Sequence, residues 1–176
     1  MRSALAAIQE KLKPRCNDVR WIPDQQLHLT VKFLGDVPDG ELDTTAAALA
    51  MAAGASQPFE MEITGCGGFP PSGSVRIVWT GVKEESGSLQ RCVESVEEAL
   101  ESAGFPRERR PFSAHITIGR VRMDRSVGRL RSVMDACSFR PVKQEVSSLT
   151  LMSSVLSPKG PAYTPVSVAR LSRINP

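Results

Sequence analysis

The chain has 176 residues, of which 41% are hydrophobic and 23% are charged, with a formal net charge of +3. Such values are ordinary for a globular protein, and the length allows one substantial core or two closely packed lobes, but not two large domains. No apolar run approaches the ~20 residues that span a bilayer, and the N-terminal segment lacks the apolar core of a signal peptide. We therefore expect a cytoplasmic protein without a membrane partner.

The first half of the chain alternates between helical and strand patterns. The predicted elements are a helix over 3–13, strands over 19–22 and 27–34, a helix over 38–53 and a strand over 59–63. Pro14 ends the first helical pattern, since proline cannot continue a helix. The glycine- and proline-rich segment 65–73 is interpreted as a flexible loop.

The second half continues the same alternation. The predicted elements are a strand over 75–82, a helix over 86–103, a strand that begins at residue 115, a helix over 125–136, and strands over 146–156 and 165–171. An arginine-rich loop at Arg107, Arg109 and Arg110 is either a guide for an RNA backbone or simply a solvated loop. Because several strands follow one another directly, the pattern favours an α+β fold with antiparallel sheets over a doubly wound parallel one.

The two histidines of the chain each begin the same short pattern, at residues 28–31 and 115–118. Side chains two apart on a strand point to the same face, so His28 pairs with Thr30 and His115 with Thr117. Imidazole suits proton transfer near neutral pH, and one acid with one base is what cleavage of a phosphate ester without a metal requires. The alternative is that both pairs are ordinary surface residues of an open sheet.

Basic and aromatic residues next to these patterns are further candidates for the site. Lys32 lies on the same predicted strand face as His28 and is either a phosphate ligand or a solvated surface residue. Arg120 lies five residues after His115, an odd offset that requires a bulge or strand end near Gly119 to return its side chain to that face. We interpret Phe33 as a core residue, with base stacking as the alternative.

The four cysteines are widely spaced and include no CxxC pair, so a zinc site is not expected. Their spacing predicts reduced thiols, most of them buried. We expect neither a metal nor a cofactor.

Residues 28–35 and 115–120 resemble the paired HxTx motifs of the 2H phosphoesterases, and more narrowly those of the RNA 2′,3′-cyclic phosphodiesterases, also called 2′-5′ RNA ligases. Residues 154–163 resemble the Ser-x-Leu…Gly-Pro-x-Tyr region of that group. The resemblance implies a single domain over 1–176 with two interleaved, pseudo-symmetric lobes, one HxTx strand in each and a cleft between them. It also implies a short apolar strand ahead of the first helix. This sequence begins inside that helix, so we expect either a truncated or mis-assigned start or a sheet that has lost one strand.

The resemblance further implies a role for each motif residue. His115 would accept a proton from water and His28 would donate one to the leaving ribose oxygen, whereas the residues alone leave the two roles interchangeable. Thr30 and Thr117 would hold phosphate oxygens, and Arg120, Lys32 and Tyr163 would complete substrate binding. The expected partner is an RNA or nucleotide with a terminal 2′,3′-cyclic phosphate, hydrolysed to a 2′-phosphate by a monomer.

Two other functions satisfy the same motifs. A phosphodiesterase for small cyclic nucleotides or ADP-ribose cyclic phosphate needs the same two histidines. A non-catalytic RNA- or nucleotide-binding module could keep the fold, although two intact His–Thr pairs favour an enzyme.

Overall fold

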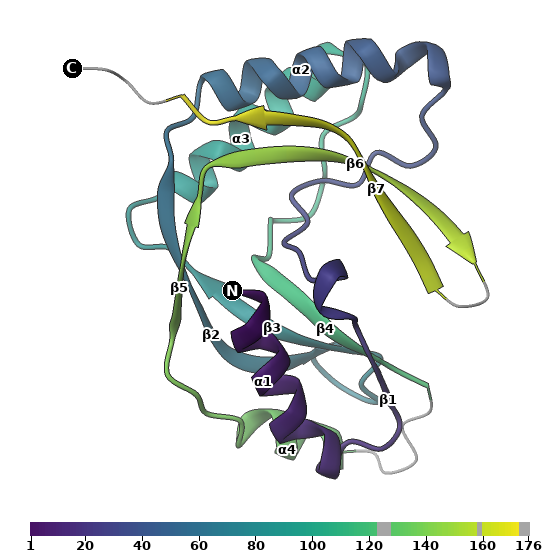
Figure 1. The fold of residues 1–176 in the computed structure, drawn as a ribbon, viewed down its shortest axis with the longest axis vertical. Helices are drawn as coiled ribbons and strands as arrows, with labels where there is room; N and C mark the ends of the chain where they lie inside the picture. The colour runs from purple at the N-terminus through teal and green to yellow at the C-terminus, as the bar shows by residue number, and fades with distance from the viewer. Residues whose placement is uncertain (123–127, 158–159, 173–176) are drawn as a thin grey trace. The chain divides into compact units, whose positions relative to one another are not determined.

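The computed structural model describes residues 1–122, 128–157 and 160–172, and Figure 1 shows the course of the chain. The chain divides into two compact units, each built from three segments that alternate along the sequence. The first unit consists of Met1–Thr30, Met61–Lys83 and Ser113–Gln144, and the second of Val31–Glu60, Glu84–Phe112 and Glu145–Pro176.

A five-stranded sheet with strand order β1-β4-β3-β2-β5 forms most of the first unit. Its strands are β1 (Val19–Trp21), β2 (Phe59–Phe69), β3 (Ile77–Lys83), β4 (His115–Val121) and β5 (Val142–Val146). β4 pairs antiparallel with both β1 and β3, and β3 pairs antiparallel with β2. The predicted α+β class with antiparallel sheets is therefore confirmed.

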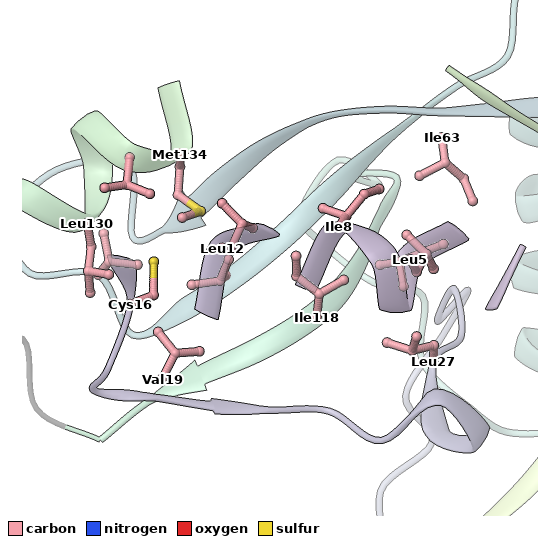
Figure 2. Packing of buried hydrophobic residues seen from close by; sticks show 14 residues of the cluster. Leu5, Ile8, Leu12, Cys16, Val19, Leu27, Ile63, Ile118, Leu130 and Met134 are labelled. Carbon is pink, nitrogen blue, oxygen red and sulfur yellow. The ribbon is translucent and has the colours of Figure 1, made fainter. Parts of the chain in front are cut away.

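Two helices of the first unit, α1 (Arg2–Leu12) and α4 (Arg129–Asp135), supply apolar side chains to the core on one face of this sheet. Helical spacing gives α1 an apolar stripe of Leu5, Ile8 and Leu12, all buried. Figure 2 shows these side chains gathered with Ile63 of β2 and Ile118 of β4. Since this face of the sheet is buried, polar side chains of the same strands must point to the other face.

The second unit contains two longer helices and a hairpin. The helices are α2 (Leu42–Gly54) and α3 (Ser88–Ser102), and the hairpin consists of β6 (Ser148–Ser157) and β7 (Gly160–Arg170). Three short 3₁₀ turns of the described chain lie outside these elements, at Lys13–Arg15 and Asp24–Gln26 in the first unit and at Asp39–Glu41 in the second. α2 contacts α3 and both strands of the antiparallel hairpin. Among the described residues, no helix is long and apolar enough to cross a membrane.

The structure corrects three sequence predictions. The segment 27–34 is not a regular strand but makes a single β-bridge, and the segment 65–73 is a loop only after Phe69, because β2 continues through its glycines. Of the predicted helix 125–136, residues 125–127 lie outside the described residues and α4 begins at Arg129. The structure also adds β5, which the periodicity did not reveal.

The expected division of one HxTx strand per lobe differs from the observed units. Both His–Thr pairs fall in the first unit, because that unit includes Met1–Thr30 and Ser113–Gln144. The predicted pseudo-symmetry and the cleft stay predictions.

A buried glutamine ties α1 to the sheet beside the second motif. The side-chain amide of Gln9, only 3% exposed, donates to the carbonyl oxygen of Ile22 at 2.8 Å and to that of Ile118 at 2.9 Å. The carbonyl oxygen of Ile118 also accepts from the backbone N–H of Ile22 at 3.0 Å, so Gln9 gives it a second hydrogen bond. A buried carbonyl that loses a donor costs free energy, and this one amide therefore stabilises the contact between α1 and both carbonyl groups.

Replacing this amide tests its contribution. We expect Gln9→Leu to lower the free energy of unfolding by about 1–3 kcal/mol, because the carbonyl group of Ile22 loses this donor and that of Ile118 loses one of its two. Urea unfolding followed by circular dichroism measures the change. Gln90→Leu, at an exposed position of α3, is the matched control and should change stability by less than about 0.5 kcal/mol. An unchanged unfolding midpoint for Gln9→Leu would contradict this role.

Candidate active site

An isolated antiparallel bridge between Leu29 and Ile116 brings the two histidine motifs together. Ile116 is fully buried in the core on the helix-covered side of β4, and Leu29 packs against the same cluster. In an extended segment, neighbouring residues point to opposite faces. The residues on either side of each bridge member therefore lie on the face opposite the core, which we call the site face.

The register of the bridge sets the four polar residues at the corners of a quadrilateral, the His–Thr quartet. In an antiparallel pair centred on Leu29 and Ile116, His28 stands opposite Thr117 and Thr30 opposite His115. Residues directly opposite each other have Cβ atoms about 4.5–5.5 Å apart, and diagonal neighbours are about 7–8 Å apart. The two imidazoles occupy one diagonal and the two hydroxyls the other, an arrangement that suits a tetrahedral anion held between them.

Each histidine is held by the same local hydrogen bond. The Nδ1 atom of His28 lies 2.6 Å from the carbonyl oxygen of Gln26, and that of His115 lies 2.7 Å from the carbonyl oxygen of Ser113. A carbonyl oxygen only accepts, so Nδ1 of each ring carries a proton and donates it. Proton exchange then falls to Nε2 of both rings, which leaves each imidazole in the tautomer and orientation needed for acid or base work.

A bulge in β4 returns Arg120 to the site face. Val78 of β3 pairs with Gly119, and Trp79 pairs with Thr117, so Ile118 is an extra residue on β4. Ile118 and Gly119 both face the core: a Cβ atom on Gly119 would lie 2.5 Å from Cγ1 of buried Val19. The alternation therefore shifts by one, and the exposed Arg120 follows Thr117 on the same face. The structure therefore contains the bulge that the odd offset of five residues between His115 and Arg120 requires.

An aromatic pair that the sequence patterns did not single out lies beside His115. The ring of Phe69 meets the imidazole edge to face at 5.0 Å between centroids, and Trp79 lies 6.4 Å from the imidazole and 5.3 Å from Phe69. Gly67 makes room for the indole, because a Cβ atom there would lie 2.2 Å from Cζ2 of Trp79. The glycines of segment 65–73 were the available signal, since a strand glycine often marks a close approach.

Lys32 has a structural partner in the second unit. Its ammonium group forms an ion pair with Glu97 of α3 and donates to the carbonyl oxygen of Pro106 at 2.8 Å, and the two charged side chains are only 5% and 10% exposed. This buried ion pair contradicts the interpretation of Lys32 as a solvated surface residue, and its role as a phosphate ligand stays a prediction.

The remaining candidates also lie in the second unit. Tyr163 stands opposite Ser154 in the β6–β7 hairpin, and its substrate role stays a prediction. The ring of Phe33 is 85% exposed, so its interpretation as a core residue is wrong. Arg107 pairs with Glu101 and Glu94, and hydrogen bonds to these carboxylates raise the pKa of its guanidinium. That pairing favours the solvated-loop interpretation of the arginine-rich segment.

The donor set of the quartet is two imidazoles and two hydroxyls, one pair on β4 and the other on the segment that bridges to it. Within the described ranges, no group of three or more His, Cys, Asp or Glu side chains is placed to hold a metal ion. The quartet with Arg120 supplies two proton-transfer groups, two neutral hydrogen-bond donors and one permanent positive charge. Such groups can bind a phosphate ester and transfer protons on opposite sides of its phosphorus atom.

The chain is similar to several known proteins over most of its length. Residues 2–157 match the family described as the 2′-5′ RNA ligase superfamily. The chain is 38% identical to the RNA 2′,3′-cyclic phosphodiesterase of Archaeoglobus fulgidus over 164 residues, which are 89% of this chain and 90% of the relative. It is 34% identical to the protein of the same name from Methanothermobacter thermautotrophicus, over 97% of this chain and 92% of the relative.

Solved structures show a similar fold. The Thermus thermophilus protein TT0787 superimposes with a TM-score of 0.77 at 29% identity, over 97% of this chain and 91% of that one. E. coli LigT, solved in complex with 3′-AMP, gives a TM-score of 0.72 at 22% identity over 98% and 94% of the two chains, a likeness that concerns the fold alone.

A double-mutant cycle tests the structural role of Lys32. We expect Lys32→Met to lower the free energy of unfolding by about 3–5 kcal/mol, because Glu97 is left as a buried charge without its partner. Adding Glu97→Leu should restore at least half of that loss, since the unpaired charge is then removed. Denaturant unfolding of the four proteins measures both effects. Wild-type stability in Lys32→Met would show that the ion pair is dispensable.

Proposed function

Because this chain belongs to the 2′-5′ RNA ligase superfamily, we propose that it hydrolyses the 2′,3′-cyclic phosphate at the end of an RNA to a 2′-phosphate, without a metal ion. The observation that supports the proposal is the bridge between Leu29 and Ile116, the residues that lie between the histidine and the threonine of each motif. The curated relatives named above, which match nearly the whole chain, carry the name of this activity.

Acid and base are assigned to the two histidines on opposite corners of the quartet. Nε2 of neutral His115 takes a proton from water, which attacks the phosphorus atom. Nε2–H of protonated His28 donates a proton to the 3′ oxygen as the bond between phosphorus and that oxygen breaks. The diagonal placement supports attack and departure on opposite sides of phosphorus, as in-line displacement requires. Which histidine is the acid rests on the family resemblance.

The other residues of the site face stabilise the charge of the reacting phosphate. The hydroxyls of Thr30 and Thr117 donate to the non-bridging oxygens from the second diagonal. Arg120 supplies a positive charge, and its guanidinium fits phosphate geometry. Lys32 is left out of this set because Glu97 and Pro106 hold its ammonium group.

Single substitutions of the histidines test the mechanism. We expect His28→Ala and His115→Ala each to lower kcat by at least about 100-fold, because each removes one of two proton transfers. The assay is hydrolysis of an oligoribonucleotide with a 2′,3′-cyclic phosphate end, with product phosphate position read by chromatography. Thr44→Ala, at an exposed position of α2, serves as the control and should keep wild-type activity.

Three further conditions separate the alternatives. Cleavage of 2′,3′-cyclic AMP but not of the oligonucleotide would indicate a small-nucleotide phosphodiesterase. Cleavage of neither substrate would indicate a binding module, and loss of activity with a chelator would contradict the mechanism without a metal. Near-normal turnover in either histidine variant would overturn the acid–base assignment.

A further inference from the structure

Two cysteine thiols from distant parts of the sequence meet on the core side of the first unit. Cys66 lies on β2, opposite Thr80 of β3, and Cys137 lies two residues after the end of α4. The side chains are separated by 71 positions in sequence, yet their Sγ atoms lie 2.6 Å apart. Both cysteines are half-buried and pack against the hydrophobic cluster.

This contact differs from the surroundings of the other two cysteines. All four cysteines carry free thiols in the structure, but only two of them, Cys16 and Cys92, are buried, whereas the sequence predicted that most are. Cys16 is buried in the same core, whereas Cys92 lies on α3 in the second unit. For Cys66 and Cys137 the structure gives a direct contact between the two sulfur atoms, whereas Cys16 interacts with both of them electrostatically. The active site uses neither residue.

We propose that Cys66 and Cys137 form a reversible disulfide bond by exchange with a low-molecular-weight disulfide such as oxidised glutathione. Disulfide formation needs Cβ atoms that approach and face one another, and two thiols already in contact meet this condition without rearrangement of the backbone. The bond would join β2 to the segment after α4, on the face of the sheet opposite the His–Thr quartet.

The exchange proceeds in two balanced steps. The thiolate of Cys137 attacks one sulfur of the reagent, whose S–S bond breaks and releases one glutathione thiolate. The thiolate of Cys66 then attacks Sγ of Cys137, forms the S–S bond between the two cysteines and releases the second glutathione. Two protein thiols are oxidised, one external disulfide is reduced, and the two thiol protons end on the released glutathione molecules.

The surroundings of Cys66 set the order and the pace of these steps. Burial raises the pKa of the Cys66 thiol, and its hydrogen bond with Cys137 raises the pKa further. A thiol with a raised pKa is a poor attacking group at neutral pH, so the first attack falls to Cys137. The closing step by Cys66 should accelerate as the pH rises toward the pKa of that thiol.

The test uses the full chain, incubated with oxidised glutathione, quenched with acid and unfolded for thiol counting. We expect the reduced chain to show four free thiols and the oxidised chain to show two, with a mass lower by two hydrogen atoms. Peptide mapping should link the peptide of Cys66 to that of Cys137. The melting temperature should rise by about 10 °C, because the bond closes a long loop in the unfolded chain.

Matched variants identify the pair. Cys16→Ala and Cys92→Ala should still lose two thiols on oxidation, whereas Cys66→Ala and Cys137→Ala should not form an intramolecular link. The wild-type thiol count and peptide map carry the test even where a variant folds poorly. Retention of all four thiols, a stable glutathione adduct without a cross-link, or a link from Cys16 to Cys137 would each overturn the proposal.

Discussion

The proposed chemistry depends on one backbone contact, the antiparallel bridge between Leu29 and Ile116. Both side chains belong to the hydrophobic core, so burial of apolar surface fixes which way each segment faces. A slip of one residue in either segment would turn its histidine toward the core and its apolar residue toward solvent. The geometry of the quartet therefore rests on the packing of two aliphatic residues, and the polar residues occupy positions that this packing leaves open.

Around this contact, the backbone does much of the positioning. Carbonyl groups at Gln26 and Ser113 hold the two imidazoles by equivalent hydrogen bonds. The bulge at Ile118 returns Arg120 to the site face. The carbonyl oxygen of Ile118 accepts one of the two hydrogen bonds that the Gln9 side chain donates. The two carbonyl groups each lie two residues before the histidine that they hold, and the bulge lies in a strand that packs on the core. The disulfide proposed for Cys66 would add a covalent tie on the opposite face of the same sheet.

Periodicity and motif spacing were sufficient to predict the α+β class and most elements, and they selected the four residues of the quartet, whose roles stay predictions. They were insufficient where tertiary contacts override the local pattern. Gly67 resembles a loop residue in sequence, but the indole of Trp79 needs the space above it, and β2 continues. Lys32 fits a strand face beside His28, yet a glutamate 65 positions away holds it. The exposed ring of Phe33 shows the same limit, since an apolar residue in an alternating segment need not face a core.

The most direct test of the account is an NMR titration with a nucleoside 2′-phosphate, the class of product that the proposed reaction releases. Because the chain has two histidines, each imidazole gives its own carbon-bound proton signal, and His28→Ala assigns them. The account predicts that both signals shift and reach saturation at the same ligand concentration, since one phosphate lies between the two rings. A shift confined to one imidazole, or two signals that saturate at different concentrations, would contradict a shared site.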